Sequence, residues 1–280
     1  PPLCLLVERG NTDAWMFLLV LLALWLTLHA RFAVRGAGYG VILLAACLKL
    51  YPAFALLSAI REGSRRRVAA VLGSTGAVFG LYLAATRSEV ATILRVIPRP
   101  IERAYGREVL PRRIVTEVNH LHIASLTDAG VRPVGIGLVV LCVILGVSLA
   151  RRMSLPESPP GGHDDERPFV AGAALFLGTL FVGHNLIYRL AVLLFCVPTL
   201  ARWSLGADRL ALLARVALGG AVVALWSSIY APLLWLSPWR ENVGLLVDQW
   251  AIWTVAVCLS ALLAVVARAR PGSIESRSRT

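Results

Sequence analysis

The stretch PVGIGLVVLCVILGVSLA, residues 133–150, contains no charged side chain and decides the class of the fold. A bilayer core of about 30 Å is crossed by roughly 20 apolar residues in an α-helix, because each residue rises about 1.5 Å along the axis. Runs of similar length that also lack Asp, Glu, Lys and Arg lie at 14–30, 68–86, 216–236 and 250–267. The sequence therefore predicts an all-α fold, a polytopic bundle of transmembrane helices.

The composition supports a membrane protein. Of the 280 residues, 58% are hydrophobic and only 16% are charged, whereas a soluble domain carries about 25% charged residues. We therefore expect a multi-pass protein of the plasma membrane that forms a single transmembrane domain over residues 1–280. Because the chain begins at Pro1 without a Met or a signal peptide, we expect it to be the C-terminal part of a longer protein.

The charges are arranged around the apolar runs. There are 27 Arg and one Lys, and the net charge is +12. In a soluble protein this excess would suggest nucleic acid, but here Arg clusters stand at the ends of apolar runs, as the positive-inside rule describes. We therefore expect membrane lipids and no nucleic acid as partners. The pattern places Arg31, Arg35, Arg61, the linker 151–168 and the C-terminal tail in the cytoplasm, and it leaves 87–132 as a long extracytoplasmic loop, although that loop is also rich in Arg.

Two apolar regions are interrupted near their middle. Residues 36–60 contain LKLYP at 48–52, which places a charge and a helix breaker at the midpoint. This predicts either a re-entrant hairpin of two helices of about 12 residues with Lys49 at its apex, or a single span kinked at Pro52. Residues 169–201 are too long for one span and break at Gly-His-Asn, 183–185, which predicts a helical pair that turns near the outer face. We expect about seven to nine membrane helices in all.

No metal site is predicted. The linker carries His-Asp-Asp-Glu at 163–166, which imitates an acidic metal-binding motif, but a solvated Pro/Gly-rich linker holds no fixed coordination geometry. The five cysteines lie in apolar stretches without a CxxC pair. We assign no cofactor, and a divalent metal stays open.

Polar residues that could carry chemistry form two groups in the N-terminal part of the chain. The sequence ERGNTD, residues 8–13, comes immediately before a span, where acids also favour the start of a helix. A lysine in the middle of an apolar run is costly, which favours a function over simple snorkelling to the headgroups. The candidates are Glu8, Arg9, Asn11, Asp13, Lys49 and Tyr51.

Two further groups follow. The outer loop contains Asn-His-Leu-His at 119–122 and many arginines, which suit lipid phosphates with or without catalysis. In GHNLIYR, 183–189, an arginine inside an apolar segment needs a partner, either a structural carboxylate or a substrate phosphate. The candidates are Asn119, His120, His184, Asn185, Tyr188 and Arg189.

The order of the motifs resembles a known family. ERGN precedes a span, LKLYPAFALL is followed by REGSRRR, and an Asn/His-rich stretch stands ahead of ASL. This arrangement is similar to the GT-C glycosyltransferases of family 87, the bacterial mannosyl- and arabinosyl-type transferases. The resemblance implies a polyprenyl-phosphate sugar donor, an extracytoplasmic site and inverting transfer to a cell-envelope glycan or glycolipid. Such enzymes use an acid in a first outer loop that no segment here matches, so Glu8 and Asp13 are catalytic candidates by position only.

The implied reaction needs a carboxylate to take the acceptor's proton and cations to stabilise the departing phosphate. We expect Lys49, Tyr51 and Arg189 to line one cavity open to the outer leaflet. Few acids lie near the apolar segments, Asp248 being the nearest candidate, so we expect a phosphate to be the partner of these cations. A transporter or lipid flippase, or a non-catalytic membrane subunit, is the alternative, and the absence of two repeated halves disfavours transport.

Overall fold

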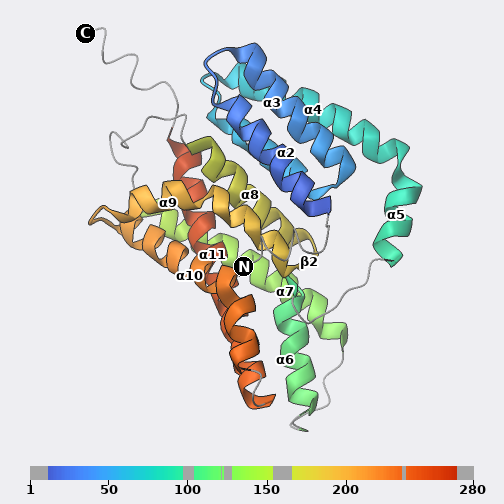
Figure 1. The fold of residues 1–280 in the computed structure, drawn as a ribbon, viewed down its shortest axis with the longest axis vertical. Coiled ribbons are helices and arrows are strands. Elements are labelled where there is room, and N and C mark those ends of the chain that lie inside the picture. The colour runs from blue at the N-terminus through green and yellow to red at the C-terminus, as the bar shows by residue number, and fades with distance from the viewer. Residues whose placement is uncertain are drawn as a thin grey trace.

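The computed structural model describes residues 12–96, 104–120, 122, 128–153, 166–234 and 238–269. Within these residues the protein is a helical bundle with one short strand pair (Figure 1). Four helices are long and apolar enough to cross a membrane, or five spans if a bent helix pair counts as one. The four are α4 (Arg65–Ala85), α7 (Val131–Arg151), α10 (Arg209–Leu234) and α11 (Pro238–Arg268).

The other apolar helices are shorter. They are α2 (Thr12–Thr27), α3 (Phe32–Leu48) and α8 (Arg167–Val182). The helical bundle is confirmed, and each uninterrupted apolar run that we expected to be helical lies mostly within one helix. We expected about seven to nine membrane helices, whereas the described residues contain four or five candidate spans and several shorter apolar helices. The shorter helices do not reach the length of a full span.

The interrupted run 36–60 is a hairpin. α3 ends at Leu48, and the chain returns as a 3₁₀ helix, η1 (Tyr51–Arg61), with Pro52 in its first turn. The two open ends of the hairpin meet, because Arg35 Nε near the start of α3 lies 3.1 Å from Glu62 Oε1 after η1. A hairpin with Lys49 at its apex is thus confirmed and the single kinked span is wrong, while its re-entrant placement in the membrane stays a prediction. The first arm is longer than we expected, with 17 residues.

A second hairpin has the same plan. α8 ends before Gly183, and the short strand β2 (His184–Leu186) leads into a second 3₁₀ helix, η4 (Ile187–Phe195). The predicted break at 183–185 is confirmed, with His184 and Asn185 in strand β2, while its position near the outer face stays a prediction. α8 packs against both η1 and η4, so it lies between the two returning arms. The return continues into α9 (Val197–Ser204), which is bent by 57° from η4.

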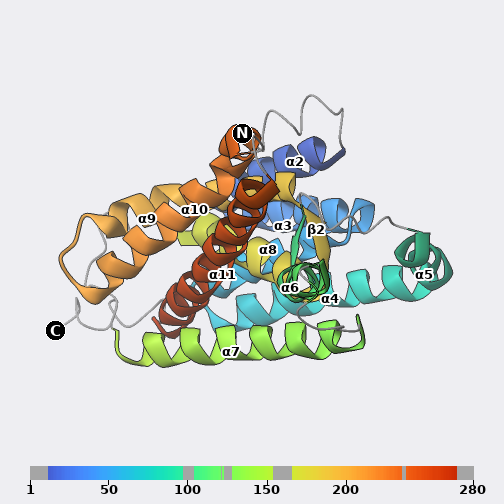
Figure 2. The ribbon, with the colours of Figure 1, turned by 90° about the horizontal axis from the view of Figure 1, so that it is seen from below.

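The long helices surround this pair of hairpins. α11 packs along both α10 and α7, and it crosses the molecule diagonally between them (Figure 2). Gly146 of α7 allows close approach, since a Cβ there would lie 2.6 Å from Ser260 Cβ. The outer faces of the bundle are apolar and exposed, as at Leu81 of α4 and Ile144 of α7. Such faces suit contact with lipid tails.

The predicted outer loop is partly helical. It contains α5 (Arg87–Val96), the strand β1 (Ala104–Gly106), α6 (Val109–His120) and the short η2 (Asp128–Gly130). β1 pairs with β2 in antiparallel register, with Tyr105 opposite Asn185. This pair joins the loop to the apex of the second hairpin. Gly106 has φ +149, and a Cβ there would lie 2.2 Å from the carbonyl oxygen of Gly183, so only glycine fits.

The opposite end of the bundle is held by buried charges. Arg61 lies 2.7 Å from Glu166 Oε2 and also donates to the carbonyl of Ala269 at 2.9 Å. Arg167 lies 3.6 Å from Glu62. Glu166 is the last residue of the acidic motif 163–166, and it is buried here; the other three residues lie outside the described part of the chain.

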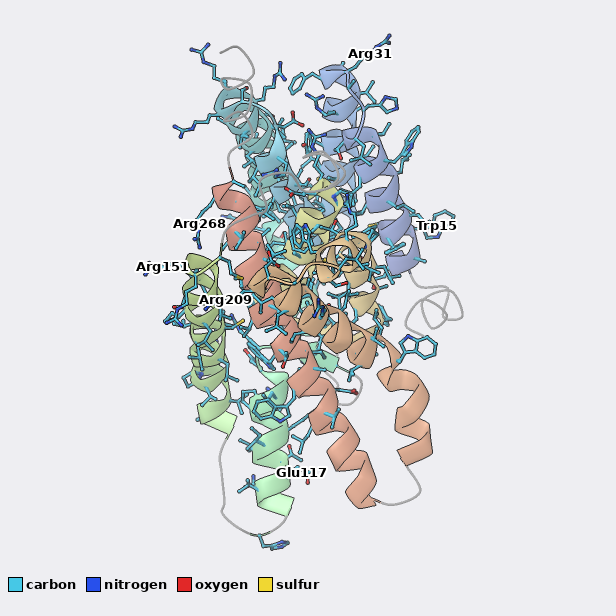
Figure 3. All side chains as sticks on the ribbon, turned by 90° about the vertical axis from the view of Figure 1, so that its left-hand side faces the viewer. Trp15, Arg31, Glu117, Arg151, Arg209 and Arg268 are labelled. Carbon is cyan, nitrogen blue, oxygen red and sulfur yellow. The ribbon has the colours of Figure 1, made fainter. Side chains whose placement is uncertain are left out.

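The last turns of α7 and α11 lie at this same end of the bundle, which we call the inner end. Arg268 donates to the carbonyl of Ala150 at 3.1 Å, so the last turns of α7 and α11 meet (Figure 3). Figure 3 also shows Glu117, near the end of α6, at the far end of the molecule. Arg61 and the end of α11 thus lie at one end of the bundle, while the cytoplasmic placement of Arg31, Arg61 and the C-terminal tail stays a prediction, and residues 270–280 of that tail lie outside the described part of the chain. Residues 151 and 167–168 of the expected linker belong to α7 and α8.

Candidate functional site

The apices of the two hairpins meet at the first turn of α2. Lys49 Nζ lies 2.7 Å from Asp13 Oδ1, and Arg189 Nε lies 3.4 Å from Asp13 Oδ2. One carboxylate therefore binds a cation from each hairpin. We call Asp13, Lys49, Tyr51 and Arg189 the apical cluster.

Local backbone structure explains these positions. Asp13 stands in the first turn of α2, where the positive end of the helix dipole stabilises an acid. Lys49 is the residue after α3 and has extended backbone angles, φ −153 and ψ 120, so its side chain leaves the helix end. Its ammonium group also donates to Thr12 Oγ1 at 3.0 Å.

Tyr51 completes the apical cluster. Its ring lies under the guanidinium of Arg189, with 5.0 Å from Cζ to the ring centroid, which is within the range of cation–π attraction. Tyr51 thus contacts the arginine that pairs with Asp13.

Arg189 is held from a second side. Its Nη1 donates to Asn185 Oδ1 at 2.6 Å, and Asn185 Nδ2 donates to the carbonyl of Thr179 at 2.6 Å. The Thr179 hydroxyl is in turn 3.0 Å from the hydroxyl of Tyr105. Burial raises the pKa of Tyr105 to about 12, so this hydroxyl stays protonated at physiological pH.

Exposure separates the roles within the apical cluster. The side chain of Asp13 is 1% exposed, while those of Lys49 and Arg189 are 27% and 21% exposed. The carboxylate is therefore enclosed, and the two cations reach the surface around it. Since two cations share one acid, one positive charge remains for an anion such as a phosphate.

An apolar cavity of about 330 Å³ lies further along η1. Phe54 and Leu57 of η1 line it together with Leu72 of α4, Gly178 of α8 and Leu263 of α11. A 3₁₀ helix has three residues per turn, so Tyr51, Phe54 and Leu57 stand in one row. Phe54 and Leu57 therefore stand in the same row of η1 as Tyr51, but no residue of the apical cluster lines this cavity.

The structure brings together several of the predicted site residues. Besides the four residues of the apical cluster, the predicted Asn185 lies at this place and contacts Arg189. The predicted Tyr188 packs against Ala14 and Phe17 near the start of α2. His184 is half-buried in β2, opposite Gly106.

Other predicted residues lie elsewhere. Asn119 is exposed at the end of α6, and His120 closes the same helix, which extends away from the hairpins (Figures 1 and 3). Glu8, Arg9 and Asn11 lie outside the described residues.

The expectation that Asp248 is the acid nearest to these cations is wrong, because Asp13 pairs with both Lys49 and Arg189. The phosphate partner of the two cations stays a prediction. Thr12, Thr179 and Tyr105 were missed, because threonine and tyrosine next to apolar runs carry no distinctive signal. Among the described residues, no group of three or more His, Cys, Asp or Glu side chains is placed to hold a metal ion.

The comparisons with known proteins give one positive result. No curated protein and no solved structure matches the chain. The model of glycosyltransferase family 87 matches residues 1–181, a range that includes α2, the first hairpin, β1 and most of α8. The match covers more than half of the chain and includes three of the four residues of the apical cluster. The chain therefore belongs to glycosyltransferase family 87 and is a membrane glycosyltransferase of that family.

Proposed function

We propose that this glycosyltransferase takes its sugar from a polyprenyl-phosphate donor and passes it to a cell-envelope glycan or glycolipid on the extracytoplasmic side. The observation that carries the proposal is the apical cluster, in which Lys49 and Arg189 stand on either side of one enclosed carboxylate. In this arrangement the two cations bind the donor phosphate.

The charges support phosphate binding. Lys49 and Arg189 would repel each other without Asp13, and each would cost about 2.5 to 3.5 kcal/mol at the centre of a bilayer on insertion scales. Asp13 offsets one charge and fixes both side chains before the donor arrives. The remaining positive charge and the exposed parts of the two cations are then available to the phosphate oxygens.

The apolar cavity supports a lipid-linked donor. It is lined by apolar side chains and begins one to two turns of η1 beyond Tyr51, which is about 6 to 12 Å along a 3₁₀ helix. A nucleotide sugar would place a second phosphate and a nucleoside where these side chains offer no polar group. An isoprenoid chain matches their chemistry.

The reaction follows from these roles. The acceptor hydroxyl attacks the anomeric carbon, the bond from that carbon to the phosphate oxygen breaks, and the polyprenyl phosphate leaves as an anion. Lys49 and Arg189 stabilise the negative charge that develops on the leaving oxygen. A carboxylate takes the hydroxyl proton, and attack from the face opposite the phosphate inverts the anomeric centre.

The base must reach the acceptor, and the enclosed Asp13 is better suited to holding the cations. Glu8, on the segment before α2, stays the candidate base by position.

The choice of donor is tested in membranes that contain the full-length protein. Radiolabelled sugar is offered either on polyprenyl phosphate or on a nucleotide, and transfer to endogenous glycolipid or glycan is measured. We expect transfer from the lipid donor, which persists when nucleotide sugars are removed by washing. Transfer that requires the nucleotide sugar and ignores the lipid donor would contradict the proposal.

A further inference from the structure

We propose that Tyr105, Thr179 and Asn185 form a chain of hydrogen bonds that positions Arg189 for the donor, so that the outer-loop strand β1 sets the geometry of the donor site. This inference rests on the proposed function, and it assigns residues to a role that lies beyond direct contact with the donor.

The links of the chain meet in Thr179, which bonds Tyr105 through its hydroxyl and Asn185 through its backbone carbonyl. Thr179 Oγ1 donates to the carbonyl of Leu175 at 2.8 Å, so the Tyr105 hydroxyl, 3.0 Å away, acts as the donor to Thr179 Oγ1. The carbonyl of Thr179 accepts from Asn185 Nδ2, and Asn185 Oδ1 accepts from Arg189, each at 2.6 Å. Tyr105 and Asn185 are also directly opposite each other in the β1–β2 pair.

Burial assigns these residues a positioning role. Tyr105 is fully buried, and the exposed fractions of Thr179 and Asn185 are 3% and 5%. None of them is open to a ligand, whereas the side chain of Arg189 is 21% exposed. Their effect on the donor must therefore pass through Arg189.

The orientation of the Asn185 amide is the central step. An amide can present either its oxygen or its nitrogen, and only the oxygen accepts from a guanidinium. The bond from Nδ2 to the Thr179 carbonyl selects the orientation in which Oδ1 faces Arg189. An arginine has many rotamers, and this acceptor together with Asp13 selects one of them.

The strand that begins the chain is itself anchored. Gln249 of α11 donates from Nε2 to the carbonyl of Ala104 at 3.2 Å, and the backbone N–H of Arg107 donates to the carbonyl of Leu180 at 2.9 Å. β1 is thereby fixed to α8 and α11 on both sides of Tyr105. The loop that contains α5 and α6 is thus connected to the donor site through β1.

The test uses small changes in the full-length protein. Tyr105→Phe and Thr179→Val each delete one hydroxyl, and Thr179→Ser keeps it as the matched control. We expect the first two variants to raise the KM for the polyprenyl-phosphate donor by about threefold to tenfold, the usual effect of one buried hydrogen bond, with kcat changed much less. Thr179→Ser should keep the wild-type KM, and all three should appear at wild-type levels in the membrane.

An Arg189→Ala background separates positioning from a purely structural role. Arg189→Ala should raise the donor KM, and adding Tyr105→Phe to it should cause no further rise, because the residue to be positioned is gone. If the Tyr105→Phe effect persists in full in that background, or if Tyr105→Phe alone leaves the KM unchanged, the positioning chain is wrong and the donor site stands. If Arg189→Ala itself leaves the donor KM unchanged, the proposed donor site fails first.

Discussion

Asp13 holds two cations that are far apart in the sequence. A carboxylate that is 1% exposed and bonded to both Lys49 and Arg189 is well placed to fix them and poorly placed to reach an acceptor hydroxyl. Removing one partner of a buried ion pair leaves the others uncompensated. The anchor role and the base role of Asp13 therefore predict different kinetics.

We expect Asp13→Asn to raise the donor KM by tenfold or more, because Lys49 and Arg189 lose the charge that fixes them, while kcat falls by less than about tenfold. Loss of a catalytic base costs roughly 10²- to 10⁴-fold in rate. Steady-state kinetics on membranes measures both values, with Glu117→Gln, far from the apical cluster, as the control. A fall in kcat of more than a hundredfold at unchanged KM would assign the base to Asp13.

At the residue scale, the sequence identified Lys49 and Arg189 because charges inside apolar runs are costly. It could not pair them with Asp13. An acid before a span is also typical of a helix start. Asp13 has both roles here, because it stands in the first turn of α2 and also binds two cations. Contacts between residues so far apart in sequence depend on how the hairpins pack, which local patterns do not encode.

The two 3₁₀ helices are the elements that build the site. η1 has 11 residues and η4 has 9, although 3₁₀ runs beyond three or four residues are uncommon. Each begins directly at a hairpin apex, so Tyr51 and Arg189 stand in the first turn of their helices. Both helices return along α8. The two hairpins thus present their apical side chains at the same end.

The strand pair predicts a sensitive glycine. In Gly106→Ala the new methyl group would meet the Gly183 carbonyl at 2.2 Å and the backbone would be strained at φ +149, so β1 should separate from β2. We expect faster proteolytic cleavage within residues 87–130 and reduced transfer. Gly130→Ala is the control, since no atom of the described residues lies within 4 Å of its added Cβ. Equal cleavage rates in Gly106→Ala and the wild type would show that the pair does not hold the loop.

At the element scale, the apolar runs and their two interruptions were predictable because length and charge decide them. The 3₁₀ form of the returning arms was not, because it depends on packing against α8 and not on composition. The strands were missed for a similar reason. Three-residue segments carry no periodicity, and β1 finds its partner about 80 residues away.

Buried charges at the inner end tie the whole molecule together. Arg61 joins η1 to Glu166 before α8 and to the last turn of α11, while Arg35 and Arg167 share Glu62. Both arms of the first hairpin and the start of α8 are therefore fixed at the end away from the apical cluster. Sequence patterns marked these arginines only as cytoplasmic charges.

Glu166→Gln should lower the thermal stability of the purified protein markedly, because Arg61 is left as a buried charge; breaking such a pair costs about 3–5 kcal/mol. Arg66→Gln changes an exposed charge of the same region and should stay within about 0.5 kcal/mol. Thermal unfolding in detergent measures both. Equal melting temperatures for the two variants would mean that the Arg61–Glu166 pair contributes nothing to stability.

The orientation in the membrane is also testable. Gly63 and Ser88 are exposed at opposite ends of α4, and the Arg-rich end should face the cytoplasm. We expect a membrane-impermeant thiol reagent to label Ser88→Cys in intact cells and Gly63→Cys only after lysis, with the unsubstituted protein as the background control. The reverse pattern would place the apical cluster in the cytoplasm.

The donor KM of Lys49→Ala tests the central claim most directly. Lys49 contributes one of the two cations of the apical cluster, and its side chain is partly exposed, so its loss should weaken phosphate binding without unfolding the bundle. We predict a donor KM at least tenfold above the wild type in membranes with equal protein content, with partial recovery in Lys49→Arg. An unchanged KM for the polyprenyl-phosphate donor in Lys49→Ala would contradict the account.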